Sequence, residues 1–390
     1  MKLLPFCIVV LFLVACTVQQ PTPATPVLPT PESAPIPETD GGTPTVEKEP
    51  TAPVTKPTEP KLIYPTLTYE GAYNGPLYET SFQAGDSGPM DLHFANMDRN
   101  GVSFTNAFFG VAFPPKADDV LLSTNELGYA LNAVKQHPGR IVPFYSQLLD
   151  PEETNINTLA KDLDEIFVAT ENVAPGFLKG IGEIPQMDLP MKADSVQMRA
   201  LADIARKHNI MLMFHPPARQ VDLVKNLIEA YPDVKFFMHM YAEDVSADAA
   251  AYGELIKDHD NLYFSIDADH MMFLDNTGLL YKYEGISNTK QAATYFVSDY
   301  DSNEEKLLKS ALARYAPLIK AAPDRVMWGT EMGPAYNYEP EVYDRMIKFT
   351  RKFIAKLSPE VQEKFAYKNA LAYFGPGITY TKNVQIIDSS

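Results

Sequence analysis

The sequence predicts an α/β protein: a (β/α)8 TIM barrel with an insertion after its seventh strand, preceded by a disordered linker. Short apolar runs, typical of strands buried on both faces, alternate with stretches of helical period throughout residues 61–390. These residues show no repeat of the length that solenoid proteins have. A doubly wound open sheet is the structural alternative. It predicts a glycine-rich phosphate turn after an early strand, and the sequence has none.

The N-terminal segment has the pattern of an export signal. Lys2 supplies a positive start, an apolar run follows, and the segment ends in Leu13-Val14-Ala15-Cys16. This ending resembles the bacterial lipoprotein signal, which implies that residues 1–15 are removed as a signal peptide and that Cys16 carries lipid. Since two acyl chains give stable attachment, we expect a protein of the cell envelope, lipid-anchored to the membrane and facing the periplasm or the exterior. An ordinary secretory signal with a chance cysteine is the alternative.

Residues 16–60 are rich in Pro and Thr and have almost no aromatic side chains and no hydrophobic period. Such a segment cannot bury enough apolar surface to offset its chain entropy. We therefore expect a disordered tether, or a glycosylated stalk, in front of one barrel domain at residues 61–390. The net charge of -17 argues against a nucleic-acid partner, which requires a basic surface.

The barrel strands are predicted from apolar runs rich in Val, Ile, Phe and Met. In chain order the runs are Met90–Phe94, Thr105–Phe113, Ile141–Tyr145, Phe177–Ile184, Ile210–His215, Lys235–Met240, Leu262–Asp267 and Arg325–Glu331. Stretches of helical period lie between most of them, and one more follows the last run. These predicted helices are Asp118–Lys135, Asn155–Thr170, Ala193–His208, Gln220–Tyr231, Ala247–Lys257, Asn303–Lys320 and Glu339–Lys356.

The insertion after the seventh run, Ala268–Asn303, is long for a loop of a compact domain. Its aromatic residues are Tyr281, Tyr283, Tyr295, Phe296 and Tyr300. We expect either an aromatic lid over the mouth of the barrel or a surface excursion with a small core of its own.

The function of such a barrel lies at the C-terminal ends of its strands. Histidines and carboxylates end several of the predicted strands, namely His93, Glu183, His215, His239, Asp267 and Glu331. Converging nitrogen and oxygen ligands suit zinc, or manganese or iron. The sequence therefore predicts a divalent metal site, with zinc as the first choice and His93, His215, His239 and Glu331 as its ligands.

The order of these motifs resembles the amidohydrolase superfamily, in the branch of amidohydrolase-related metal-dependent hydrolases. The resemblance covers about residues 85–375, and the family's metal ligands end strands 1, 5, 6 and 8 of a (β/α)8 barrel. Its first strand usually reads Asp-x-His-x-His, where Asp91-Leu92-His93-Phe94-Ala95 keeps the first histidine and has Ala95 for the second. His215 and His239 match the ligands of strands 5 and 6. Glu331 stands where the family has an aspartate that is both ligand and proton shuttle.

Gly182-Glu183-Ile184 is also similar to the TatD-like deoxyribonuclease branch, which implies that Glu183 is a metal ligand that replaces the one lost at Ala95. The alternative is a buried carboxylate paired with Lys179 or an arginine. Lys179 itself is similar to the carbamylated lysine that other branches carry on strand 4.

The resemblance implies a metal-dependent hydrolase that attacks a small carbonyl, amide or ester substrate with metal-activated water. Glu331 would be the general base, and His239 or Arg219 would orient the substrate. A salt bridge at a helix start is the alternative role of Arg219. The changes at Ala95 and Glu331 also fit a non-catalytic binding lipoprotein on a degenerate barrel. Some members of the family decarboxylate aromatic acids, so lyase chemistry at the same site stays open.

Overall fold

The computed structural model describes residues 59–84, 89–111, 126–147, 155–186, 189–239, 242–274 and 277–382. The predicted signal peptide, Cys16 and almost all of the tether lie outside these residues.

None of the helices within the described ranges has the length and apolar character needed to cross a membrane.

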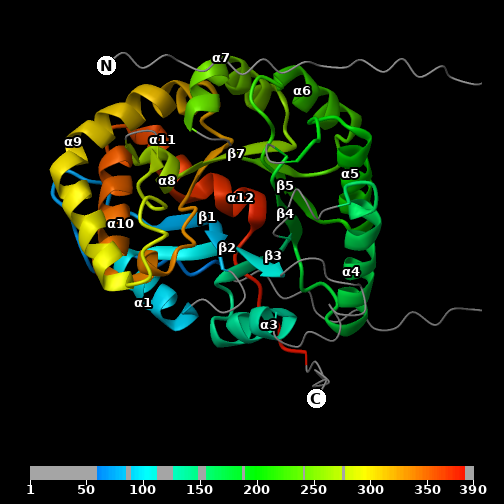
Figure 1. Cartoon of the computed structure of the whole chain (residues 1–390), viewed down its shortest axis with the longest axis horizontal. Coiled ribbons are helices and arrows are strands. Elements are labelled where there is room, and N and C mark those ends of the chain that lie inside the picture. The colour runs from blue at the N-terminus through cyan, green and yellow to red at the C-terminus, as the bar shows by residue number, and fades with distance from the viewer. Residues whose placement is uncertain are drawn as a thin grey trace, which may run out of the picture. The chain divides into compact units, whose positions relative to one another are not determined.

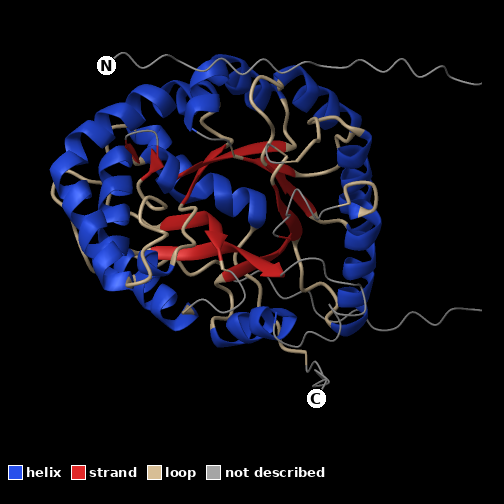
Figure 2. Cartoon of the chain, in the orientation of Figure 1, coloured by secondary structure: helices blue, strands red, loops and turns tan. Residues whose placement is uncertain are grey.

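A ring of parallel strands surrounded by helices forms the domain (Figures 1 and 2). Each strand pairs with the next along the chain, in the order β1 (Leu77–Gln83), β2 (Val102–Val111), β3 (Ile141–Gln147), β4 (Gly180–Ile184), β5 (Met211–Phe214), β6 (Phe236–Met238), β7 (Leu262–Asp267) and β10 (Val326–Gly329). The predicted (β/α)8 barrel is confirmed.

The ring closes where β1 meets the chain that follows β10. The backbone N–H of Gln83 donates to the carbonyl of Met332 at 3.1 Å, and the N–H of Glu331 donates to the carbonyl of Ser81 at 2.8 Å. These bonds join the C-terminal ends of the two strands, so Ser81, Gln83 and Glu331 share one end of the barrel.

Helices follow most strands and cover the outside of the ring (Figure 2). Those between strands or after the last one are α1 (Met90–Asn100), α3 (Glu126–Gln136), α4 (Leu159–Val173), α5 (Val196–His208), α6 (Val221–Ala230), α7 (Ala242–Asp258), α9 (Thr289–Ala321) and α10 (Pro340–Ile354). Helix α5 buries Met198, Leu201 and Ala205, which recur at helical spacing. The side chain of Ser195 accepts a hydrogen bond from the Met198 N–H and caps its first turn.

The C-terminal segments α11 (Pro359–Glu363), η2 (Lys364–Lys368) and α12 (Asn369–Phe374) follow α10. The ring of Phe374 packs on Tyr78, Phe144 and Phe237 from three different strands. The amide of Asn369 donates to the carbonyl of Val326, the first residue of β10. Helix α12 therefore covers the N-terminal end of the barrel, opposite the end where the strands finish.

The predicted first strand, Met90–Phe94, is wrong. These residues begin helix α1, whose buried side chains Met90, Phe94 and Met97 follow the helical spacing i, i+4, i+7. The true first strand, β1, precedes it and carries Glu79, Thr80 and Ser81 fully buried. A search for apolar runs passes over such a strand, because half of its buried side chains are polar.

The insertion after β7 contains the short helix α8 (Ala268–Met271) and the hairpin β8 (Phe273–Leu274) and β9 (Thr277–Gly278). The predicted helix Asn303–Lys320 starts earlier than expected, at Thr289 of α9. Phe296 and Tyr300 are consequently buried core residues of α9, whereas Tyr295 is exposed. Phe296 and Tyr300 belong to the main hydrophobic core of the barrel, so this part of the insertion is not a surface excursion with a core of its own.

Candidate metal centre

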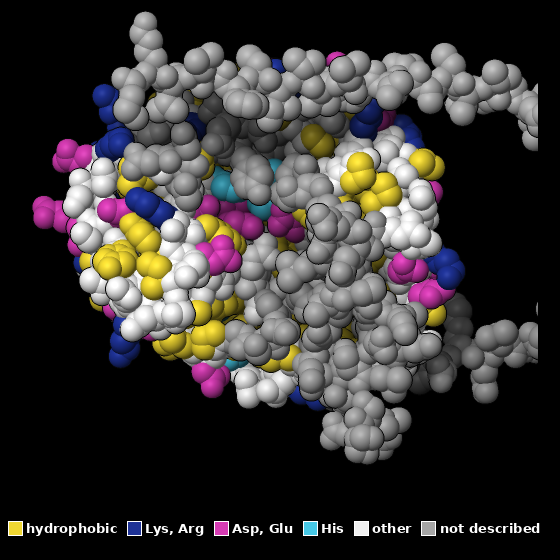
Figure 3. All heavy atoms as spheres, in the orientation of Figure 1, with side chains coloured by type: hydrophobic (Ala, Val, Ile, Leu, Met, Phe, Trp, Pro, Cys, Tyr) yellow, Lys and Arg dark blue, Asp and Glu magenta, His cyan; other side chains and the backbone are white. Residues whose placement is uncertain are grey.

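Acidic and histidine side chains lie at or just after the C-terminal ends of five strands. Glu183 lies in β4, His215 and His239 follow β5 and β6 directly, Asp267 ends β7, and Glu331 comes two residues after β10. Parallel strands of one barrel end on the same face, which explains the convergence. Figure 3 shows histidine and acidic side chains gathered in a hollow on the face turned to the viewer.

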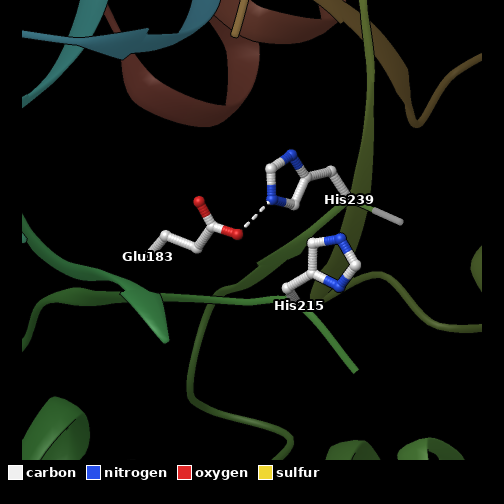
Figure 4. A group of neighbouring side chains, drawn as sticks. All are labelled: Glu183, His215 and His239. Carbon is white, nitrogen blue, oxygen red and sulfur yellow. Dashed lines mark hydrogen bonds and ion pairs between the residues drawn. The ribbon is translucent and has the colours of Figure 1, made fainter. Parts of the chain in front are cut away.

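Glu183, His215 and His239 form the centre of this group (Figure 4). Each of them offers a ligand atom, and these three atoms lie within 4.8 Å of one another. His239 Nε2 is 2.6 Å from Glu183 Oε1, and the two imidazole rings are 4.7 Å apart between centroids. Both histidines are buried. Two imidazoles and a carboxylate are a common zinc ligand set that leaves a fourth position open for water or substrate.

His239 is held in one orientation by its other ring nitrogen. Its Nδ1 is 2.7 Å from Asp267 Oδ2, and Ser265 Oγ donates to Asp267 Oδ1 at 2.6 Å. Thr80 Oγ1 lies 2.8 Å from Ser265 Oγ and extends the chain. A carboxylate that accepts a hydrogen bond from Nδ1–H keeps the proton on Nδ1, so that the Nε2 lone pair is available to a metal ion. That nitrogen is the one directed at Glu183, so the residues present fit a divalent ion.

The protonation of His239 follows from the same contacts. Burial lowers the pKa of the imidazole, but the charges of Glu183 and Glu331 and the hydrogen bond with Asp267 outweigh burial and raise it well above its ordinary value. Burial likewise opposes ionisation of Asp267, and the His239 hydrogen bond still holds the pKa of this carboxyl below its usual range. His239 and the carboxyl groups of Glu183, Asp267 and Glu331 thus form one electrostatic network.

Glu331 has both carboxylate oxygens engaged by β1. Ser81 Oγ donates to its Oε2 at 2.5 Å, and Gln83 Nε2 donates to its Oε1 at 3.0 Å. Burial, the largest cause, raises the pKa of Glu331 to about 8, with Glu183 and Asp267 adding to it and His239 opposing it. A carboxyl with a pKa near neutrality is suited to accept and return a proton.

A second group of possible ligands shares His239 with the first and adds Asp267 and His270. Asp267 Oδ2 is 3.9 Å from His270 Nδ1. Burial lowers the pKa of His270 to about 4, so this imidazole is neutral near neutral pH. Because Asp267 is already the acceptor for His239 Nδ1, the group of Glu183, His215 and His239 is the better metal site.

The structure does not bring His93 to this centre. His93 lies on α1, fully buried, with its ring stacked on Phe82 and its Nε2 3.2 Å from Glu79 Oε2. Ala95 is likewise on α1, so the match of Asp91–Ala95 to a first-strand motif does not hold in space. The side chains that the true first strand presents at the centre are Ser81 and Gln83.

Three other predicted residues are placed as follows. Glu183 pairs with His239, and not with Lys179, which lies just before the start of β4, at the opposite end of the barrel. Glu331 joins the centre as expected, in a left-handed backbone conformation with φ of 56°. Arg219 is exposed and forms no salt bridge with any residue that the structure describes, so the helix-start alternative is not seen.

Sequence reasoning missed Ser81, Gln83 and the role of Asp267. The alternation of Tyr78, Thr80 and Phe82, residues with high strand propensity, was the available signal for β1. No local pattern shows that Asp267 orients His239, because the two residues are adjacent only through the pairing of β6 with β7.

Part of the insertion reaches the centre. The carbonyl of Leu280 accepts hydrogen bonds from Asn337 Nδ2 at 3.0 Å and from the Tyr336 hydroxyl at 2.5 Å. A Cβ at Gly333 would lie 3.1 Å from the Tyr281 hydroxyl and 3.4 Å from Gln83 Cβ. Burial, followed by the charge of Glu331, raises the pKa of Tyr281 well above its ordinary value, so the phenol stays protonated. The Tyr281 hydroxyl thus lies close to Gly333 and Gln83, beside the centre.

The solved structures that are similar to this chain include an amidohydrolase and a decarboxylase. An amidohydrolase from Burkholderia multivorans with bound zinc is 11% identical, with a TM-score of 0.44, covering 77% of this chain and 100% of that one. The 5-carboxyvanillate decarboxylase from Novosphingobium aromaticivorans, complexed with manganese and a nitrobenzoic acid, is 11% identical, with a TM-score of 0.43, covering 78% of this chain and 97% of that one. No curated protein matches the sequence. The profile of the Amidohydrolase family matches residues 93–375, well over half of the chain, and the protein belongs to this family.

Proposed function

We propose that the protein is a metal-dependent hydrolase of a small carbonyl, amide or ester substrate, with zinc as its ion. The observation that carries this proposal is the convergence of Glu183, His215 and His239, with three ligand atoms within 4.8 Å of one another at the functional end of the barrel. Burying two imidazoles and a carboxylate together is costly unless they are paired or bind a metal.

The position of each residue indicates its role. Glu183, His215 and His239 would hold the ion, which supplies Lewis acidity and lowers the pKa of bound water. Glu331, with its pKa raised to about 8, would take a proton at its carboxylate and return it to the leaving group. Asp267 keeps His239 in the required tautomer. Tyr281 would exclude water, and the exposed Arg219 would hold a substrate carboxylate.

The location is part of the proposal. We propose that the mature chain begins at Cys16, carries lipid there, and is held in the cell envelope by this anchor. The support is the export-signal pattern of Met1–Cys16.

The test uses the full chain, with metal content measured by mass spectrometry and hydrolysis measured on a panel of small esters, lactones and amides. Aromatic carboxylates in the panel detect decarboxylation by the same site. We expect about one equivalent of zinc, loss of activity on chelation and recovery on adding zinc. His215→Ala should abolish both binding and activity. His259→Ala should change neither, because His259 lies between α7 and the start of β7, at the opposite end of the barrel, and its Nδ1 bonds to the Leu255 carbonyl.

A protein that binds no ion with zinc added would refute the proposal. That result would favour the non-catalytic binding protein instead. Equal zinc content in the His215→Ala variant and the unaltered protein would refute the assignment of ligands.

A further inference from the structure

Strand β1 brings two uncharged side chains to the metal centre. Gln83 Nε2 lies 3.0 Å from Glu331 Oε1 and 3.3 Å from Glu183 Oε2. Ser81 Oγ donates to the other oxygen of Glu331 at 2.5 Å. The amide of Gln83 is thus placed between the carboxylates of β4 and of the segment after β10.

The chemistry of these groups decides which end of the Gln83 amide faces the carboxylates. Gln83 Nε2 is the donor in both hydrogen bonds, so the NH2 group faces the two carboxyl groups, with one hydrogen for Glu183 and one for Glu331. An amide NH2 has no lone pair to offer a cation. The β1 side of the centre is therefore occupied by donors, whereas Glu183 Oε1 lies on the other side, with His239 Nε2.

The same bridge offsets a repulsion. Ionisation of both Glu183 and Glu331 would place two like charges in a largely buried site, and hydrogen bonds to ionised groups are stronger than those between neutral groups. A donor shared between them stabilises a spacing that repulsion would otherwise widen. A second cation between the same two carboxylates would have to displace the Gln83 NH2 group.

We propose that Gln83 is a positioning residue that bridges Glu183 and Glu331 and thereby limits the centre to a single divalent ion. The inference rests on the proposed function for the ion held by Glu183, His215 and His239. It adds the number of ions and the residue that sets this number.

The test is the zinc stoichiometry of the full chain, measured by mass spectrometry after dialysis against zinc and by isothermal titration with zinc alone. Gln83→Glu replaces the donor with a ligand of the same length, so we expect one more equivalent than in the unaltered protein. Gln83→His offers a neutral ligand, should give the same gain, and covers the case in which the added charge prevents folding. Gln83→Leu removes the donor without adding a ligand and should add no equivalent.

Gln362→Glu is the matched control, because it makes the same chemical change on α11, where Gln362 donates to Leu357. It should leave the stoichiometry unchanged, and circular dichroism should show all variants folded. Two equivalents in the unaltered protein, or no gain in folded Gln83→Glu and Gln83→His, would overturn the inference.

The two proposals fail separately. The difference in stoichiometry between the variants and the unaltered protein tests Gln83. The absolute content of the unaltered protein tests the proposed metal-dependent function. One equivalent in the unaltered protein with no gain in the folded variants would refute the role of Gln83 and leave the proposed function standing, whereas no zinc in the unaltered protein would refute the proposed function.

Discussion

Asp267→Asn isolates the hydrogen bond that orients His239. The substitution keeps the shape of the side chain and removes its charge. Asp267 and His239 are both buried and meet at 2.7 Å, so solvent does not screen the interaction. An asparagine can accept the Nδ1 proton only through its oxygen. Its NH2 group must then face Ser265 Oγ, which now donates to Asp267 at 2.6 Å, so that bond would have to reverse.

The expected effect is a loss of zinc affinity. Removing a carboxylate that orients a metal-binding histidine typically weakens binding by about 10–100-fold, or about 1.4–2.8 kcal/mol. The loss is about tenfold if the hydrogen bond between Ser265 and residue 267 reverses, because His239 then keeps its tautomer and loses only the nearby charge that makes Nε2 more basic. The loss is about 100-fold if that hydrogen bond does not reverse, because the asparagine NH2 group then faces His239 Nδ1 and the ring proton moves to Nε2.

The assay is competitive isothermal titration with zinc and a chelator of known affinity. Asp301→Asn, at an exposed pair with Arg345, is the matched control and should bind zinc as the unaltered protein does. An affinity for zinc that stays within twofold in Asp267→Asn would refute the claim that Asp267 orients a metal ligand.

Three further predictions concern stability and location. Arg351→Met should lower the free energy of unfolding by about 3 kcal/mol, because the buried guanidinium donates to the carbonyls of Tyr73, Gly75 and Asn100. Chemical denaturation measures this change. The control Arg345→Met, on the same helix, should lower the free energy of unfolding by less than about 1 kcal/mol. An equal loss in the two would contradict this. Burial opposes ionisation of Glu304, but hydrogen bonds from Lys352, Tyr300 and Lys348 outweigh it and lower its pKa from 4.5 to about 2. After allowance for screening, the ionised Glu304 should contribute about 1–2 kcal/mol to the free energy of unfolding above pH 4.5, and this contribution should be lost as the pH falls towards 2. Denaturation at a series of pH values should show a weaker pH dependence for Glu304→Gln. An unchanged pH profile would contradict the assignment. Cys16→Ser should move the protein from the membrane fraction to the soluble fraction, and full retention in the membrane would rule out Cys16 as the anchor.

The fold followed from local sequence wherever a strand is apolar on both faces. Residues Leu262–Asp267 were predicted with the bounds that β7 has in the structure, because such a strand is an uninterrupted run of residues that favour burial. His215 and His239 were found with their strands, since each follows an apolar run directly. The alternation of these runs with helical stretches was enough to specify the barrel.

Only the tertiary structure showed which residues complete the centre. The polar side chains of β1 bond to residues at the ends of other strands, as Thr80 does to Ser265 and Ser81 to Glu331. The sequence of β1 therefore lacks the apolar run of a buried strand, and the nearest such run is Met90–Phe94, which is helical. Gln83, Glu183 and Glu331 are far apart in the chain and meet only because the ring closes between β1 and β10. Local patterns report the burial of each segment, whereas a hydrogen bond between side chains on different strands depends on the register and closure of the whole barrel.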